Sequence, residues 1–247
     1  MKRRTFLLAS ASTAGAMIPW LGRAAAPCPP PEVSAGGGTT ASTPCGSGVP
    51  AGSYTTNFPL TENPISEGGR WTNAGAVGLD WNNVQSAPGR AFGAAIVSGY
   101  NDDIAVLNTG FAANQYAQGT VHRVGGYSPG VSHEIELLLR FQITAHNARG
   151  YEVLWGVDGQ FAIVRWNGPL GDYTPLLDNV NIGQAVDGDV LRAEISGSTI
   201  TVYKNGSQVG TVSNSTYTYG QPGIGFWPKS GAILQNYGWK TFEAGSL

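Results

Sequence analysis

The residues from His133 to Ile143 alternate between two chemically different sets. The odd positions are mostly apolar, whereas the even positions are Glu134, Glu136, Leu138, Arg140 and Gln142. Successive side chains of a β-strand point to opposite faces of a sheet. The pattern therefore predicts a strand with one apolar face and one charged face.

Similar short alternating runs follow along most of the chain, and glycine-containing turn pairs separate them. This spacing is typical of an antiparallel β-sandwich. A two-residue turn at Asp158-Gly159 would place Trp155 opposite Ala162 on one face and Glu152 opposite Arg165 on the other. The other apolar pairs in this register are Val153–Val164 and Tyr151–Trp166.

A three-strand meander is predicted around two turn pairs, because the two give consistent registers. The turns are Gly197-Ser198 and Asn205-Gly206, and both place apolar residues on the same face. The predicted apolar pairs are Ile195–Ile200, Ala193–Val202 and Val202–Val209.

Residues 188–227, which run from GDVLRAEISG to GIGFW, resemble the late strands of concanavalin A-like lectin/glucanase domains, including laminin G-type modules. Residues 58–71 and 100–116 resemble early strands of bacterial members. The resemblance implies an all-β jelly roll of two antiparallel sheets. It also implies that the first strand (54–59) lies beside the last (234–242). Ligands of this superfamily are mostly carbohydrates, bound in a concave groove or at an edge with calcium.

The chain divides into three parts. Residues 1–26 begin with a basic cluster containing Arg3-Arg4 and continue with an apolar stretch. They resemble a twin-arginine export signal, which predicts a periplasmic or secreted protein and no membrane insertion of the mature chain. Residues 27–52 are a Pro/Gly/Ser/Thr-rich linker in which Cys28 and Cys45 could form a disulfide. Residues 53–247 form one predicted domain.

Charged residues make up only 12% of the chain, and the formal net charge is −2. This composition argues against nucleic acid as a partner. It is typical of an extracellular β-protein that meets neutral or weakly charged material. Because charge is scarce, the place where ionisable side chains gather is the first candidate for a binding site.

If the strands at 133–143, 151–157 and 160–166 are neighbours in one sheet, six polar side chains would share a surface. They are Glu134, Glu136, Arg140, Gln142, Glu152 and Arg165. Such a surface is either a ladder of cross-strand ion pairs facing solvent or a groove that binds a glycan. Trp81, which precedes two asparagines, is either an aromatic platform for sugar rings or a side chain packed on the sandwich edge.

Two catalytic alternatives use the same surface. Glucanases of the superfamily carry Glu-x-Asp-x-Glu on one strand. Here Glu134 and Glu136 match the first two acidic positions, but Leu138 stands at the third, and Glu152 from the next strand would have to replace it. A polysaccharide lyase would use arginine and glutamine to neutralise a uronate and His133 or Tyr151 to take the proton. The predicted alternation places both of the latter on the apolar face.

The segment Asn101-Asp102-Asp103 is rich in oxygen ligands. Asp102 and Asp103 are candidate ligands for a structural Ca²⁺, or the segment caps a turn. No other cofactor is expected. The sequence thus predicts an exported jelly roll that binds a polysaccharide on a polar, concave sheet face. A polysaccharide-degrading enzyme and an envelope or adhesion domain without a glycan ligand are the alternatives.

Overall fold

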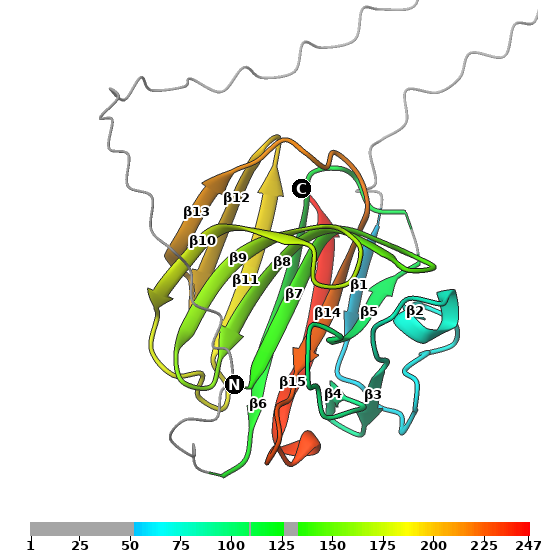
Figure 1. Cartoon of the computed structure of the whole chain (residues 1–247). Coiled ribbons are helices and arrows are strands. Elements are labelled where there is room, and N and C mark those ends of the chain that lie inside the picture. The colour runs from blue at the N-terminus through cyan, green and yellow to red at the C-terminus, as the bar shows by residue number, and fades with distance from the viewer. Residues whose placement is uncertain (1–51, 109, 126–132) are drawn as a thin grey trace, which may run out of the picture. The chain divides into compact units, whose positions relative to one another are not determined.

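The computed structural model describes residues 52–108, 110–125 and 133–247. The predicted export signal and both cysteines lie outside the described residues. The described part of the chain is built from antiparallel strands in two sheets (Figure 1), as predicted. Its helical turns, η1 (Ala74–Val77) and η2 (Leu234–Asn236), are 3-10 turns. Within this part, no helix is long and apolar enough to cross a membrane.

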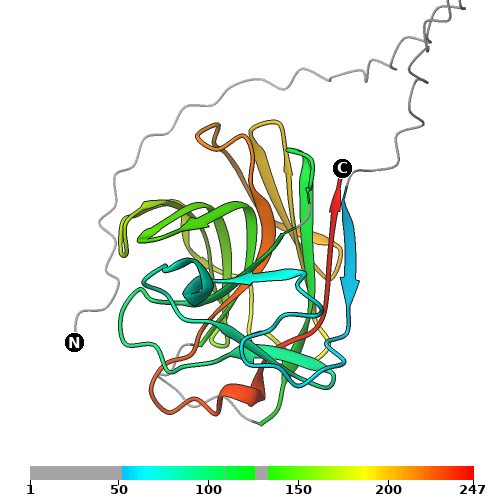
Figure 2. The same cartoon turned by 90° about the vertical axis from the view of Figure 1, so that its right-hand side faces the viewer.

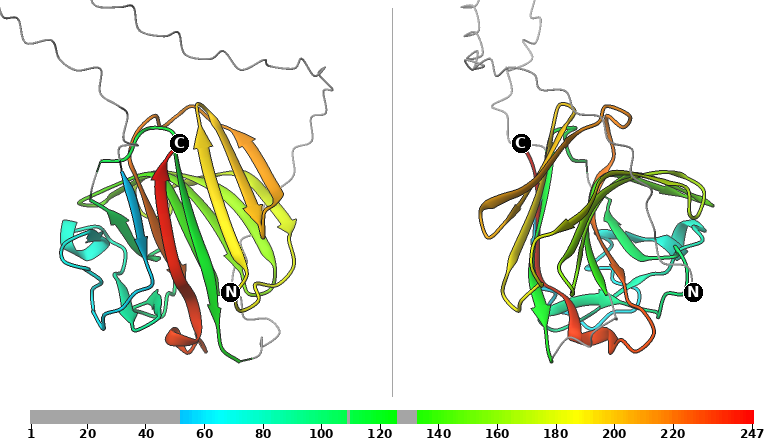
Figure 3. Two further views of the ribbon diagram at one scale, coloured as in Figure 1. Left: turned by 180° about the vertical axis from the view of Figure 1, so that it is seen from behind. Right: turned by 60° about the vertical axis from the view of Figure 1, so that its left-hand side comes forward.

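One sheet has eight strands in the order β13-β12-β11-β6-β15-β4-β3, with β1 also paired to β15. Figure 3 shows this sheet from its outer side in the left-hand view. The strands are β1 (Ser53–Thr56), β3 (Val84–Ala87), β4 (Arg90–Gly93), β6 (Gln115–Arg123), β11 (Val190–Ser196), β12 (Thr199–Lys204), β13 (Ser207–Ser213) and β15 (Tyr237–Ser246). The first strand pairs with the last, Thr56 opposite Phe242, as the resemblance implied.

The second sheet has seven strands in the order β10-β9-β8-β7-β14-β5-β2. They are β2 (Trp71–Asn73), β5 (Asp103–Leu107), β7 (Glu134–Thr144), β8 (Asn147–Gly156), β9 (Gln160–Gly168), β10 (Tyr173–Asn181) and β14 (Gln221–Trp227). The central strand β7 is the alternating segment of the sequence. Its neighbours β8 and β14 bury it along most of its length.

The main core lies between the two sheets. It contains the odd-numbered residues Ile135, Leu137 and Leu139 of β7 together with Trp239 and Phe242 of β15, all at most 1% exposed. The apolar face predicted from the alternation is therefore confirmed for Ile135, Leu137 and Leu139, whereas Phe141 and Ile143 belong to the cluster on the other face of this sheet. Burying large side chains from both sheets is the main stabilising contribution to such a sandwich.

A second apolar cluster covers the opposite face of the seven-stranded sheet. Leu138, Leu154 and Trp166 from the sheet pack there against Leu79 and Trp81. The covering residues belong to the segment that follows β2 and includes η1, which lies beside this sheet in Figure 2. The outer face of the seven-stranded sheet, which was expected to be open and charged, is therefore partly covered by residues 74–81.

The predicted meander is confirmed, with one local difference. Ile195 lies opposite Ile200, and Ala193 lies opposite Val202. The turn Asn205-Gly206 pairs Lys204 with Ser207, but a bulge then places Val202 opposite Gly210 and not Val209.

The predicted register of the β8–β9 hairpin is wrong by one residue. The strands end at Gly156 and resume at Gln160, so the loop has three residues and not two. Gly159 has φ +93° and donates its N–H to the Gly156 carbonyl, which is the geometry of a three-residue hairpin loop with a left-handed last position. Glu152 therefore lies opposite Val164, and Arg165 lies opposite Tyr151. The extra residue exchanges the two faces of β9.

Candidate functional site

Three carboxyl groups converge on the face of the seven-stranded sheet that points away from the main core, which we call the second face. Oxygen atoms of Asp102, Glu136 and Glu152 all lie within 4.8 Å of one another, and each residue is at most 1% exposed. We call these three residues the buried acid cluster. Glu136 lies on β7 and Glu152 on β8, whereas Asp102 directly precedes β5.

Local sequence creates the space for this cluster. Gly225 on β14 lies opposite Glu136, and a Cβ atom at Gly225 would overlap the Glu136 carboxylate. On the other side, Trp166 donates its indole N–H to Glu152 over 2.6 Å. This hydrogen bond exists because the three-residue loop places Trp166 and not Arg165 on the acidic face.

Glu134 follows the same face but lies at the end of β7, opposite Gly156 and Trp227, and is 4% exposed. Three of the six residues predicted to share a surface, Glu134, Glu136 and Glu152, thus do lie on one face of the sheet. They are buried, however, and not displayed on an open groove.

Arg140 does not belong to that face, contrary to the prediction. Its φ of +46° marks a bulge in β7, which interrupts the alternation. Its guanidinium donates to the carbonyls of Ala113, Tyr217 and Gly197 over 2.7 to 2.9 Å. Phe141 takes the opposite side and joins the second apolar cluster. Arg140 therefore holds three chain segments together.

Arg165 is also placed elsewhere, because of the hairpin register. Its guanidinium donates to Asn167, Thr216 and Thr174 over 2.8 to 3.2 Å. The predicted pairing of Glu152 with Arg165 is wrong, and so is the ladder of cross-strand ion pairs built on it.

Trp81 is 4% exposed, so it is packed inside the structure and is not a platform at the surface. Its ring meets Trp166 edge-on with centroids 4.4 Å apart, and Phe141 lies 6.2 Å away. Of the two alternatives for Trp81, the packed one is correct. Its role is to close the second apolar cluster above the buried acids.

The side chains of the two predicted calcium ligands, Asp102 and Asp103, lie on opposite faces of the seven-stranded sheet. Asp102 joins the buried acid cluster, whereas the Asp103 carboxylate accepts the N–H of Ala95 over 3.2 Å next to Gly93. Consecutive residues leave a strand on opposite faces, so the two cannot share an ion. The chemistry of a Ca²⁺ site, several carboxylate oxygens at close range, fits Asp102 with Glu136 and Glu152 instead.

Asp103 has an unusual ionisation. It is fully buried between the sheets, and burial raises the pKa of its carboxyl group to about 8, although N–H groups of Ala94 and Ala95 oppose the shift. A buried carboxyl group with this pKa is protonated at neutral pH.

The second face remains open at one end. A cavity of about 300 Å³ lies where β14 begins, beside β2, β5 and β7. We call it the sheet-end cavity; its lining includes Thr72, Asn108, Phe141, Gln142, Tyr219 and Gln221. Tyr219 is 68% exposed. Gln142 donates to the Tyr219 carbonyl over 3.0 Å and so fixes the segment that carries this ring.

Gln142 is the one predicted site residue that lines this cavity. Sequence reasoning missed Asn108, Tyr219 and Gln221, which lie in loops or at strand ends. The only signal for Tyr219 and Gln221 was the composition of STYTYGQ (215–221), an aromatic-rich polar segment that also suits an ordinary turn. Asn108 had no such signal.

No protein-family model matches the chain, and no curated protein matches it in sequence. Solved structures do match in fold. A GlcNAcα1-4Gal-releasing endo-β-galactosidase from Clostridium perfringens is 9% identical with a TM-score of 0.51, over 78% of this chain and 62% of that one. A xylan β-1,4-xylosidase from Bacillus halodurans is 13% identical with a TM-score of 0.50, over 78% and 39%.

A further match is the carbohydrate-binding module CBM66 from Bacillus subtilis, 14% identical with a TM-score of 0.49 over 74% of this chain and 95% of that one. The chain spans less than two thirds of the length of the two enzymes. The fold is a concanavalin A-like jelly roll, as the resemblance of residues 188–227 implied.

Proposed function

We propose that this protein is an exported carbohydrate-binding protein that holds a polysaccharide in the sheet-end cavity. The observation that carries the proposal is the exposed Tyr219 ring beside the amides of Asn108, Gln142 and Gln221. Aromatic rings stack on the apolar faces of sugars, and amide groups both donate to and accept from hydroxyls. The low charge of the chain suits a neutral glycan. The basic start of the chain, Arg3-Arg4, supports export.

The buried acid cluster lies on the same face of the seven-stranded sheet as this cavity, but residues 74–81 cover it. In this proposal its members do not contact the ligand. They support the face from beneath, with Glu152 orienting Trp166 and Trp166 in turn packing on Trp81.

A glycan array tests the proposal with matched pairs of variants. We expect Tyr219→Ala to weaken glycan binding about tenfold, the loss of roughly 1.4 kcal/mol of stacking energy. Gln142→Ala should also weaken it. Tyr100→Ala and Gln184→Ala are controls, because these residues are exposed and lie outside the cavity. Glycan binding by both cavity variants that is as strong as binding by the parent protein would contradict the proposal. Retention of no glycan at all would favour an adhesion or envelope domain.

Polysaccharide hydrolysis is a second candidate, and the spacing of the carboxyl groups favours it. Retaining glycosidases place two carboxyl groups about 5–5.5 Å apart, and Glu136 and Glu152 have oxygens within 4.8 Å. Their burial means that a substrate would have to displace chain 74–81. Release of reducing ends from neutral polysaccharides, lost in both Glu136→Gln and Glu152→Gln, would support this function. Absence of turnover by the parent protein would exclude it for those substrates.

A further inference from the structure

The outer face of the eight-stranded sheet carries a straight row of polar side chains from six neighbouring strands. Each is the direct cross-strand partner of the next. We call this row the outer rung; it consists of Thr55, Glu243, Gln118, Arg192, Tyr203 and Gln208. It faces away from the main core and from the sheet-end cavity.

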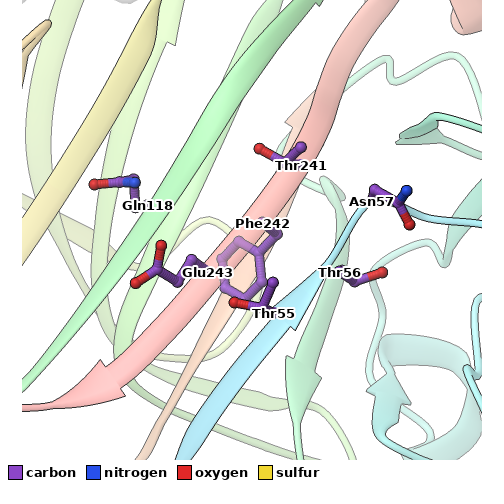
Figure 4. A pocket seen from close by; sticks show the side chains of 7 residues that line it. All are labelled: Thr55, Thr56, Asn57, Gln118, Thr241, Phe242 and Glu243. Carbon is purple, nitrogen blue, oxygen red and sulfur yellow. The ribbon is translucent and has the colours of Figure 1, made fainter.

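Two hollows lie along the outer rung. One of about 490 Å³ lies at β1, β15 and β6, and its lining includes Thr55, Asn57, Gln118 and Glu243 (Figure 4). The other, of about 240 Å³, is lined by Gln118 and Tyr203 with parts of β11. Because Gln118 lines both, the two hollows adjoin across the strands, and we call them together the trough. Neighbouring strands are about 4.8 Å apart, so the rung spans roughly 24 Å.

The charged groups on this face are held by one another. Arg192 donates to Glu194 over 2.6 Å, and its guanidinium lies 3.7 Å from the centre of the Tyr116 ring. Tyr116 donates its hydroxyl to Glu243. The same ring covers Gly245, where any Cβ would overlap it. The Tyr116 ring and its charged neighbours are therefore fixed in position without a ligand.

Several uncharged groups along the trough are available to a ligand. Among the described residues, the hydroxyls of Thr55 and Tyr203 and the side-chain amide of Asn57 make no hydrogen bond. Gln118 uses its carbonyl oxygen to accept from Arg192 over 3.4 Å, and its amide N–H groups donate to no other described residue. Hydroxyl, amide and aromatic groups thus alternate with charges that are already paired.

We propose that the outer rung is a second binding site, for a neutral oligosaccharide that lies across the strands. Hydroxyls of such a ligand can accept from Gln118 and Asn57 and donate to Glu243, while the Tyr203 ring packs on a sugar face. An anionic chain would meet Glu243 and Glu194, and a cationic chain would meet Arg192. This site does not depend on the sheet-end cavity, since the two lie on opposite outer faces of the sandwich.

Affinity electrophoresis of the full chain tests the proposal. The gels contain laminarin, xylan, galactomannan or dextran as neutral probes, and polygalacturonate or chitosan as charged ones. The Tyr219→Ala protein is used as the background, so that binding in the sheet-end cavity is weakened in every sample. We expect one neutral polymer to retard this protein, and Tyr203→Ala or Gln118→Ala to weaken that retardation about tenfold.

Tyr100→Ala and Gln184→Ala in the same background serve as matched controls, and thermal melts verify that every variant is folded. Three results would overturn the proposal: no retardation of the Tyr219→Ala protein by any neutral polymer, retardation by charged polymers alone, or retardation that both outer variants leave unchanged. None of these results contradicts glycan binding in the sheet-end cavity. That proposal fails only if the parent protein and the Tyr219→Ala variant bind glycans equally.

Discussion

Two side chains show how far local geometry alters the meaning of a charged residue. Arg140 was predicted to bind a ligand, but because of the bulge its guanidinium donates hydrogen bonds to three backbone carbonyls. Asp103, predicted as a calcium ligand, lies between the sheets with a pKa of about 8. Neither position differs in the sequence from an ordinary strand residue, because bulges and burial depend on contacts from distant segments.

The ionisation of Asp103 makes a prediction at this scale. Its folded pKa of about 8 is above the ordinary value of 3.8. The folded state therefore binds one more proton than the unfolded state between these values, and stability falls as pH rises through that range. We expect Asp103→Asn to remove this dependence. The difference in free energy of unfolding, variant minus parent, should increase by up to about 1.4 kcal/mol for each pH unit between pH 5 and pH 8.

Urea denaturation of both proteins at a series of pH values measures this difference. Other titrating groups are shared by parent and variant and cancel in the comparison. A difference that stays constant from pH 5 to pH 8 would show that Asp103 titrates normally.

At the scale of elements, the loop at Asp158-Gly159 decides which side chains meet the acids. The sequence pair is compatible with two-residue and three-residue loops, and the two differ by one position in the strand that follows. The alternation of β7 and the meander at β11–β13 were predictable because several residues agree on each register. The hairpin depended on one turn alone, and Ala162 and Val164 are apolar enough to suit either face.

The structure requires glycine at position 159. It has φ +93°, and a Cβ there would lie 2.8 Å from both Asn181 and Gly183. We expect Gly159→Ala to lower the free energy of unfolding by about 2 kcal/mol through backbone strain and these contacts. Gly231 has φ +91° with open space around it, so Gly231→Ala should cost only about 1 kcal/mol, the strain alone. Equal shifts in urea midpoint for the two variants would contradict the role of the contacts.

At the scale of the whole molecule, the sandwich presents two separate outer faces. The fold was predictable, since strand periodicity and turn glycines extend over the whole domain. The site was less so, because chain 74–81 covers the face on which Glu136 and Glu152 lie, and nothing in its own composition marks it as a cover. Tyr219 and the outer rung can be recognised as candidate binding residues only once the fold has placed strands distant in sequence side by side.

The two proposed binding sites together predict cross-linking. A protein with one glycan site on each outer face should join two polysaccharide chains, provided that both bind the same polymer. We expect the parent protein to raise the light scattering of a dilute solution of the bound polysaccharide. Tyr219→Ala and Tyr203→Ala should each abolish this rise while each retains binding in affinity gels. Equal scattering by parent and single variants would show that one site accounts for all binding.

The outer rung has a consequence for how such a protein could diversify. A rung takes one residue from each strand, so its six members are spread from Thr55 to Glu243 and share no fixed spacing along the chain. Single point substitutions can therefore change what the face recognises, one position at a time, while strand order and core stay intact. Related proteins with different ligand preferences would share a fold and differ at scattered exposed positions, without a contiguous motif to record the change.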